Sequence, residues 1–372
     1  MKTWHALWAG AALALSLFAP SAQAQILIGQ TAGFSGQVAA GVKETTDGAL
    51  LYIDSVNAKG GVNGQKIELI SLDDKFDPKL AAENARKLIE ENNVSAMFLN
   101  RGTPHTEAII PLLDKHGVVL VGPSTGAMVL HQPVRKYIFN VRATYQREAE
   151  KAMTHLASMG ITRIALMYAD DSFGADGIAG AQKGLTAAKL TPVVVEKFDR
   201  AKPDFPPIAV KIAKADAQAV LMVASGSAVV DAGNALRSAG SGAQIVTLSN
   251  NASGGFIKSL GANARGVIVT QVYPNERAVT FPMVKEAQEL AKAKGLTEIS
   301  PAMLEGYAAA KVLVEGLKRA GPKPSREKIH AALESIKKFD LGGLEVTYGP
   351  DDHTGLDFAD LSIIGTDGRF RR

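Results

Sequence analysis

Cysteine is absent from the 372-residue chain. The protein therefore has no disulfide, no thiolate nucleophile and no cysteine that could carry a lipid anchor. Tryptophan is nearly absent too, since the only two, Trp4 and Trp8, lie at the extreme N-terminus. Neither sign of charge dominates, because 41 basic residues are interspersed with 37 acidic ones. Without a clustered basic face, we predict no nucleic-acid partner.

The common cofactor and metal motifs are missing as well. There is no G-x-G-x-x-G and no H-E-x-x-H, and the histidines are scattered without ligand spacing. We therefore predict no metal site and no cofactor. Residues 36–43 (GQVAAGVK) approach P-loop spacing, but Val42 stands where the lysine should be. We interpret this segment as the start of a helix, with Ser35 as its N-cap.

A long apolar run occurs only at the N-terminus. Lys2 supplies a positive charge, residues 6–18 are apolar, and Ala22-Gln23-Ala24 is a small-x-small cleavage site. The run is shorter than the roughly 20 residues of a membrane-spanning helix. We therefore expect residues 1–24 to be a cleaved signal peptide and the product to be periplasmic.

The rest of the chain alternates between apolar runs and amphipathic stretches, which predicts βαβ units with parallel sheets. The predicted strands are 26–30, 67–72, 95–99, 118–122, 137–141, 163–168, 193–198, 219–223, 244–249 and 266–272. Predicted helices between them include 80–92, 107–116, 146–159 and 228–239. The mature chain is too long for one ordinary core, so we expect two domains.

We place the breaks between lobes near residues 142–147, 273–275 and 341–349. One lobe is then 25–144 plus 274–345, and the other is 145–273 plus 346–372. Segments 66–78 (KIELISLDDKFDP) and 191–203 (TPVVVEKFDRAKP) resemble each other. This similarity indicates either two lobes of like topology or the general resemblance of any two βα units. Three crossings between two lobes form a hinge beside a cleft.

Two strand-to-helix turns carry the polar residues that suit a ligand. The first is residues 100–106 (NRGTPHT), and the second is residues 122–126 (GPSTG). Turns of this kind meet at the carboxyl ends of parallel strands, where ligands bind in such folds. Their hydroxyl and backbone N–H groups suit a carboxylate.

The second turn also matches the nucleophile elbow G-x-S-x-G of α/β-hydrolases. In that interpretation Ser124 is a nucleophile and His330 or His353 its base. Three features oppose it: the following helix would be very short, no oxyanion loop precedes it, and no acidic third member is marked. We favour a hydrogen bond to a ligand and keep a secreted serine hydrolase as the alternative.

Polar loops also follow three strands of the predicted second lobe. Residues 170–174 (DDSFG) read either as an acidic helix start or as a loop that carries Phe173 into the cleft. Ser225, Ser227 and Asn250 lie in the other two loops, which are either solvated turns or part of the cleft.

The chain resembles the leucine/isoleucine/valine-binding protein family, the type I periplasmic solute receptors of ABC importers. The strand at 26–29 (ILIG), the loop at 31–36 and the stretch NAKGGVNGQKIEL (57–69) carry the resemblance. The resemblance implies two Rossmann-like lobes, a three-segment hinge and ligand capture in the cleft. It aligns Thr103 with the hydroxyl for the ligand carboxylate, Ser124, Thr125 and Gly126 with a small-residue turn, and Phe173 with a cleft tyrosine.

Several positions depart from that family's pattern. Asn250 stands where amino-acid receptors place the acid that binds the α-ammonium, and the covering tryptophan is missing. Arg101 adds a cation beside Thr103. An amide cannot neutralise an ammonium, and a buried unpaired charge is costly. We therefore expect a carboxylate without an α-ammonium, aromatic or branched aliphatic.

These features predict a non-enzymatic, monomeric periplasmic receptor that delivers a small carboxylate or amino-acid-like ligand to an inner-membrane ABC permease. A receptor for a signalling partner remains a further alternative. The predicted ligand-binding residues are Phe34, Arg101, Gly102, Thr103, Ser124, Thr125, Phe173, Ser225, Ser227, Asn250 and Tyr273.

Overall fold

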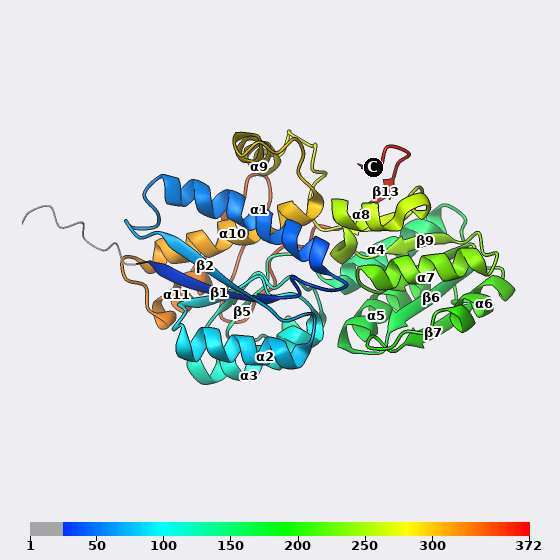
Figure 1. Cartoon of the computed structure of the whole chain (residues 1–372), viewed down its shortest axis with the longest axis horizontal. Coiled ribbons are helices and arrows are strands. Elements are labelled where there is room, and N and C mark those ends of the chain that lie inside the picture. Colours follow the sequence, from blue (N-terminus) through cyan, green and yellow to red (C-terminus); the bar gives the residue numbers. More distant parts are fainter. Residues whose placement is uncertain (1–24) are drawn as a thin grey trace, which may run out of the picture.

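A computed structural model describes residues 25–372. It has two lobes, each built on its own sheet (Figure 1). The expected signal peptide, residues 1–24, lies outside the described residues. No helix within residues 25–372 is long and apolar enough to cross a membrane.

The first lobe contains a parallel sheet of order β2-β1-β3-β4-β5. Its strands are β1 (Ile26–Ala32), β2 (Ile67–Asp73), β3 (Ala96–Phe98), β4 (Leu120–Val121) and β5 (Ile138–Phe139). Helices α1 (Ala39–Ala58) and α10 (Pro301–Ala320) pack together on one face, and α2 (Pro78–Arg86) and α3 (Thr103–His116) cover the other (Figure 1). Helices α9 (Pro282–Ala293) and α11 (Arg326–Glu334) complete this lobe, with the short hairpin of β11 (Phe339–Asp340) and β12 (Glu345–Val346).

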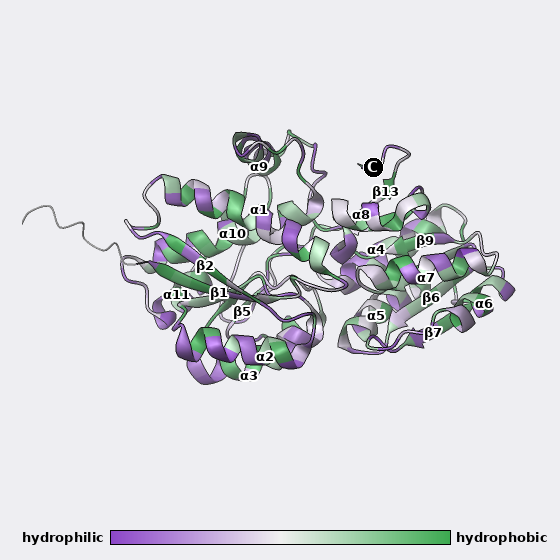
Figure 2. Ribbon diagram, in the orientation of Figure 1, coloured by the Kyte–Doolittle hydropathy of each residue, from purple (hydrophilic) through white to green (hydrophobic). Residues whose placement is uncertain are grey.

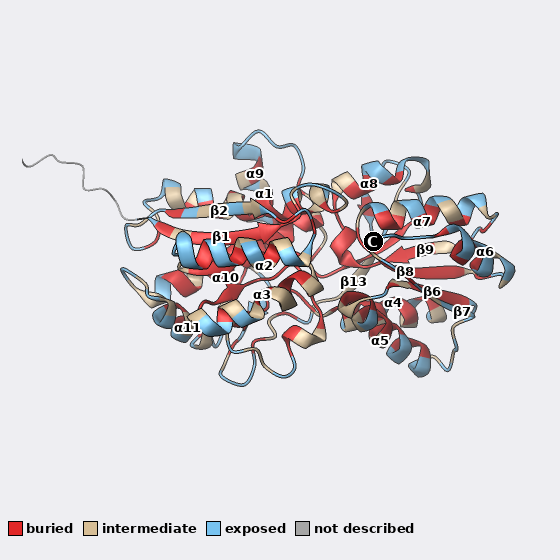
Figure 3. Cartoon of the chain, turned by 60° about the horizontal axis from the view of Figure 1, so that its bottom comes forward, coloured by how far each residue is buried: buried red, intermediate tan, exposed pale blue. Residues whose placement is uncertain are grey.

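The second lobe contains a sheet of order β14-β13-β10-β9-β8-β6-β7. Its strands are β6 (Ile164–Ala169), β7 (Val194–Phe198), β8 (Ala219–Val223), β9 (Gln244–Thr247), β10 (Ile268–Gln271), β13 (Asp360–Ile364) and β14 (Phe370–Arg371). Helices α4 (Tyr145–Ser158) and α5 (Ser172–Ala187) lie on one face, and α7 (Ser227–Ser238) and α8 (Gly254–Leu260) on the other (Figure 3). Helix α6 (Pro206–Lys214) packs against α7.

The predicted α/β architecture of two lobes is confirmed, and the two sheets share one topology. The order β2-β1-β3-β4-β5 repeats as β7-β6-β8-β9-β10 in the second lobe. The similar segments 66–78 and 191–203 contain β2 and β7, which occupy equivalent edge positions. The second sheet differs by two added strands, because β13 and β14 pair antiparallel at its other edge. We had not predicted these strands.

The burial pattern explains why these elements form. Central strands such as β8 are buried along their whole length, as expected for parallel strands covered by helices on both faces (Figure 3). Figure 2 shows apolar residues concentrated in the strands and alternating with polar residues along the helices. Such helices bury one apolar face against the sheet and expose the other.

The third crossing between lobes lies later in the chain than we predicted. Val346, Tyr348 and Leu356 belong to the buried core of the first lobe, and the chain joins the second sheet only from β13 onward. The polar turn after residue 349 therefore does not mark the boundary. The backbone N–H of Leu356 donates to the carbonyl of Val141 (3.0 Å) and holds this segment on the first lobe. We propose lobe boundaries of 25–144 plus 274–356, and 145–273 plus 357–372.

The start of α1 also differs from our prediction. The helix begins at Ala39, and Val38 makes no side-chain cap. Ser35 is not the N-cap, because its hydroxyl donates to Asp73 Oδ2 (2.6 Å) in the neighbouring loop. Gly36, with φ of 80°, turns the chain between Ser35 and the helix.

Candidate functional site

The two predicted turns of the first lobe meet beside the second lobe. Residues 101 and 124 form an isolated parallel bridge that extends the β3–β4 pairing. The hydroxyls of Thr103 and Thr125 are hydrogen-bonded to each other at 2.7 Å. Gly102, with φ of 98°, lets the chain turn from β3 into α3. The sequence spacing thus places a cation and three hydroxyl groups at one edge of the sheet.

Arg101 is the central charged group of this arrangement. Its side chain is buried, and its Nη1 donates to Ser124 Oγ (3.2 Å). Its Nη2 donates to the backbone carbonyl of Asn250 in the opposite lobe (2.6 Å). Within residues 25–372, no carboxylate forms an ion pair with this guanidinium. Burial lowers the pKa of Arg101, so its charge lacks full compensation inside the protein.

The second lobe contributes loops that follow β6, β8 and β9. Asp171 caps α5 by accepting a hydrogen bond from the N–H of Gly174 (3.1 Å), so the predicted helix start is confirmed. The same carboxylate accepts from Arg200 Nε (2.6 Å). Asn250 Nδ2 donates to the carbonyl of Ala224 (3.2 Å) and to Ser225 Oγ (3.0 Å). The loops are therefore fixed by their own hydrogen bonds.

Six of the predicted residues enclose one narrow interlobe cavity of about 10 Å³: Arg101, Gly102, Thr103, Phe173, Ser225 and Asn250. Ser124 and Thr125 stand behind it as partners of Arg101 and Thr103. An adjoining cavity of about 240 Å³ is lined by Ser227 and again by Arg101 and Asn250. Because the first space is no larger than one water molecule, a ligand that occupies it must enter while the lobes are apart.

Two further predicted residues, Phe34 and Tyr273, also line neither of these cavities. Phe34 packs on a small cluster that includes Val38, Val42 and Phe76. Tyr273 is buried in the core of the first lobe, close to the hinge. Aromatic character alone did not separate cleft walls from core packing at these positions.

Four residues beside Arg101 were not predicted: Phe76, Pro104, Tyr145 and Arg200. The guanidinium of Arg200 lies over the rings of Phe76 (5.3 Å) and Phe173 (5.5 Å), so it joins the two lobes by cation–π contacts. Phe76 has φ of 60°, a conformation that the sequence does not reveal. Asp171 with Arg200 is a long-range ion pair, which only a three-dimensional arrangement shows.

A buried ion cluster anchors the first hinge segment to the second lobe. Arg142 donates to Glu148 and to Ser249 Oγ (2.8 Å), and Glu148 accepts from the N–H of Ser249 (2.9 Å). Thr270 Oγ1 also donates to Glu148. Glu305 of the first lobe lies 3.9 Å from Arg142 Nη1, and its Oε1 has no hydrogen-bond partner among the described residues.

The hydrolase alternative is wrong. Neither candidate base has Ser124 as a partner, since His330 Nε2 contacts the carbonyl of Lys136 (3.0 Å) and His353 Nδ1 that of Ile138 (3.0 Å). His353 is stacked on Phe139, away from the cleft turn. Ser124 Oγ instead accepts a hydrogen bond from Arg101 Nη1 (3.2 Å).

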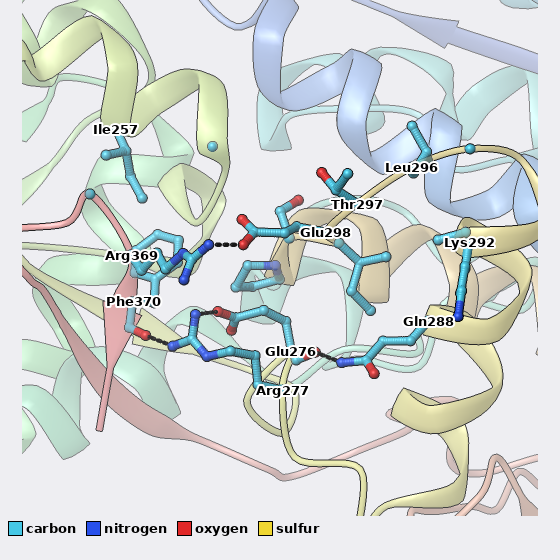
Figure 4. Close-up of a pocket in the computed structure, with 17 residues that line it drawn as sticks. Ile257, Glu276, Arg277, Gln288, Lys292, Leu296, Thr297, Glu298, Arg369 and Phe370 are labelled. Carbon is cyan, nitrogen blue, oxygen red and sulfur yellow. Dashed lines mark hydrogen bonds and ion pairs between the residues drawn. The ribbon is translucent and has the colours of Figure 1, made fainter.

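A larger cavity of about 650 Å³ lies beside α8, between β14 and the segment that joins α9 to α10 (Figure 4). Its acids are paired with arginines: Glu298 with Arg369, and Glu276 with Arg277 (3.2 Å). Its remaining cation, Lys292, is exposed. Because these charges are already matched or solvated, the buried guanidinium of Arg101 is the stronger attractor for an anion.

Two Rossmann-like lobes with a polar cleft between them define a solute receptor. Residues 25–358 match the family model described as "Periplasmic binding protein", and the chain belongs to that family. The Leu/Ile/Val-binding protein BraC3 of Rhizobium johnstonii is 28% identical over 340 residues, which is 89% of each chain. A substrate-binding periplasmic protein from Ralstonia solanacearum is 30% identical with a TM-score of 0.86, covering 93% of this chain and 99% of that one. A possible leucine/isoleucine/valine-binding protein from Rhodopirellula baltica is 27% identical with a TM-score of 0.88, covering 95% and 97%.

This membership confirms the predicted family and the non-enzymatic function. The protein is a periplasmic solute receptor of the kind that serves ABC importers.

Proposed function

We propose that the receptor captures a small carboxylate that lacks an α-ammonium and passes it, as a monomer, to an inner-membrane ABC permease. The observation that carries this proposal is the unpaired burial of Arg101. A ligand carboxylate would accept the Nη2–H that now reaches the carbonyl of Asn250, and the Thr103 hydroxyl lies in the same cavity. Charge-assisted bonds of this kind are stronger than bonds to neutral acceptors.

The absence of acidic groups supports a ligand without an ammonium. Among the described residues, no aspartate or glutamate lines either cleft cavity. Asn250 uses its amide donors on Ala224 and Ser225 and carries no charge. An ammonium placed there would be desolvated without a counter-ion, which costs several kcal/mol.

The walls around Arg101 favour an aromatic or branched aliphatic body. Phe76, Pro104, Tyr145 and Phe173 line the same cavity, and the rings of Tyr145 and Phe173 pack edge to face at 4.9 Å. Apolar and aromatic walls with a few placed polar groups are typical of small-molecule sites.

An amino acid is the second candidate ligand. Relatives of this chain carry names that specify leucine, isoleucine and valine. Glu305 Oε1 is buried without a hydrogen-bond partner among the described residues, so it is the group that an ammonium would use. Glu305 already faces Arg142 at 3.9 Å, however, which reduces the field available to a ligand cation.

Matched ligand pairs separate the two candidates. We would titrate leucine against 4-methylpentanoate and phenylalanine against 3-phenylpropanoate by calorimetry, after a thermal-shift screen. A ligand that binds only the native state increases the free energy of unfolding by RT ln(1 + [L]/Kd), and the unfolding temperature rises with it. The proposal expects the deaminated acid of each pair to bind more tightly. Tighter binding of leucine or phenylalanine would contradict the proposal that Asn250 disfavours a ligand with an α-ammonium.

We further propose that the mature receptor begins at Gln25 after removal of the signal peptide. Processing would remove Trp4 and Trp8, which are the only tryptophans of the chain. The intact mass of the periplasmic product and its emission spectrum test this together. A tryptophan emission band from the purified protein would contradict it.

A further inference from the structure

Helix α1 of the first lobe reaches across the cleft to α8 of the second lobe (Figure 1). Glu44 of α1 accepts two hydrogen bonds there. The N–H of Gly254 donates to its Oε2 (2.9 Å), and the N–H of Gly255 donates to its Oε1 (2.7 Å). Both carboxylate oxygens of one lobe are thus engaged by the backbone of the other.

The same contact depends on close approach at glycine. A Cβ atom on Gly255 would lie 2.5 Å from Ala40 Cβ, so a side chain there would push the lobes apart. Gly226 is similarly tight, since a Cβ atom would lie 1.8 Å from the carbonyl oxygen of Gln37. That carbonyl also accepts from the N–H of Ser227 (3.3 Å).

The neighbouring position, Gly254, is not crowded. A Cβ atom there would meet nothing nearer than Glu44 Oε1 at 3.6 Å, an ordinary contact. The two adjacent glycines therefore differ in whether they limit the approach of α1. Both have φ values that a side chain tolerates, since neither is among the positive-φ glycines.

Another interlobe ion pair is less significant for closure. Arg369 and Glu298 pair across the lobes, but their side chains are 50% and 57% exposed. Exposed pairs contribute little because water and salt screen them. Hydrogen bonds from backbone N–H groups to a charged carboxylate contribute more to stability than such exposed ion pairs do.

We propose that Glu44 is a positioning residue that acts as a latch, holding the two lobes in the closed arrangement. The absence of a side chain at Gly255 allows α1 to approach α8 closely enough to make this contact. The latch borders the 240 Å³ cavity, which Ala40 and Gly255 both line. It holds the closed arrangement over any captured solute. This inference goes beyond the proposed ligand class and does not depend on it.

The absence of cysteine allows a direct measurement of closure. Cysteines introduced at the touching pair Glu298 and Arg369 would be joined by a short bis-methanethiosulfonate cross-linker. The rate of cross-linking in ligand-free protein reports how often the lobes close, even when closure is rare. The same rate is then measured with leucine and with 4-methylpentanoate added.

The test variants, each made in that double-cysteine background, are Glu44→Ala and Gly255→Ala, with Gly254→Ala as the matched control. We expect the first two to slow cross-linking about tenfold and the control to stay within about twofold of the parent. Alanine is a better helix former than glycine, so Gly255→Ala should not lower the unfolding temperature without ligand.

Equal cross-linking rates in Gly255→Ala and Gly254→Ala, or an unchanged rate in Glu44→Ala, would overturn the latch. A fall in rate that accompanies a lower unfolding temperature in both Glu44→Ala and Gly255→Ala would overturn it too, because it would indicate a fold defect. Failure of 4-methylpentanoate to bind would contradict the proposed ligand class alone, since the ligand-free cross-linking rates do not involve a ligand.

Discussion

The guanidinium of Arg101 and the backbone carbonyl of Asn250 are 2.6 Å apart across the cleft. This bond joins a buried cation of one lobe to a neutral acceptor of the other. A neutral carbonyl satisfies the N–H group but leaves the charge uncompensated. The pair therefore marks the position where an anionic group of the ligand would be most stabilised.

Replacing this cation is the most direct test of the carboxylate proposal. We expect Arg101→Met to weaken 4-methylpentanoate and 3-phenylpropanoate binding by about 10- to 100-fold, since a hydrogen bond to a charged group contributes about 1.5–3 kcal/mol. Arg101→Lys keeps the charge but loses the planar fork, so its effect should be intermediate.

Stability separates a binding defect from a folding defect in these variants. Removing an uncompensated buried charge should leave the unfolding temperature of Arg101→Met unchanged or raised. Arg163→Gln, at an exposed ion pair with Asp216, serves as the control and should bind normally. Unaltered affinity in Arg101→Met, measured by calorimetry, would rule out Arg101 as the anion site.

Ser124 tests the ligand-binding interpretation of the G-x-S-x-G turn. Its Oγ accepts from Arg101 Nη1, so Ser124→Ala removes a group that orients the guanidinium. We expect a loss of about 0.5–3 kcal/mol in binding free energy by calorimetry. The exposed Ser158→Ala should show none. A fluorophosphonate probe should not label the wild-type protein, and labelling at Ser124 would be evidence for the serine hydrolase hypothesis.

Much of the fold was predictable because its signals are local. The apolar runs that predicted β1, β2, β6 and β8 are short, continuous and bounded by turn residues, which is typical of buried parallel strands. The strands β13 and β14 were missed because antiparallel addition at a sheet edge depends on distant partners. The prediction of Ser35 as an N-cap was wrong for a similar reason, since its hydroxyl donates a hydrogen bond to the distant Asp73.

The candidate site was predictable only in part. Residues 101–103 and 124–125 follow directly from strand ends, so their meeting was inferable from topology. Arg200 was not, because it follows β7 by two residues and reaches Phe76 and Phe173 only through its long side chain. Closure contacts such as Glu44 with Gly255 connect residues far apart in sequence and leave no local pattern.

Asn250 is expected to set the preference against amino acids. We predict that Asn250→Asp lowers the affinity for 4-methylpentanoate and increases the ratio of leucine to 4-methylpentanoate affinity. The overall affinity should also fall, because the donors to Ala224 and Ser225 are lost. Asn263→Asp is the control, since its amide bonds Asn234 Oδ1 (2.7 Å) and lines neither cleft cavity. An unchanged ratio in Asn250→Asp, or an equal change in the control, would contradict this prediction.

The burial of Asp74 leads us to expect that the stability of the folded protein depends on pH. The side chain is buried, its Oδ2 accepts from Thr31 Oγ1 (3.0 Å), and its Oδ1 accepts from the N–H of Phe76 (2.9 Å). Burial raises the pKa of Asp74 from 3.8 to about 6. The folded protein therefore binds this proton more tightly than the unfolded chain does. The associated stability is fully present below pH 3.8 and is lost as the pH rises through about 6.

Urea denaturation of the wild type and Asp74→Asn between pH 4 and 7 checks this. The variant cannot ionise. We therefore expect its free energy of unfolding to increase relative to that of the wild type by on the order of 2 kcal/mol from pH 4 to pH 7.

The neighbouring Asp73 provides a control of opposite sign. Burial opposes the shift, but hydrogen bonds from Ser35 and Lys75 lower the pKa of Asp73. The ionised Asp73 stabilises the fold above the ordinary carboxyl pKa, and this stabilisation is lost as the pH falls. The free energy of unfolding of Asp73→Asn should therefore decrease relative to that of the wild type as the pH rises from 3 to 5. Parallel pH profiles for the wild type and Asp74→Asn would show that Asp74 is ionised in the folded protein as readily as in the unfolded chain.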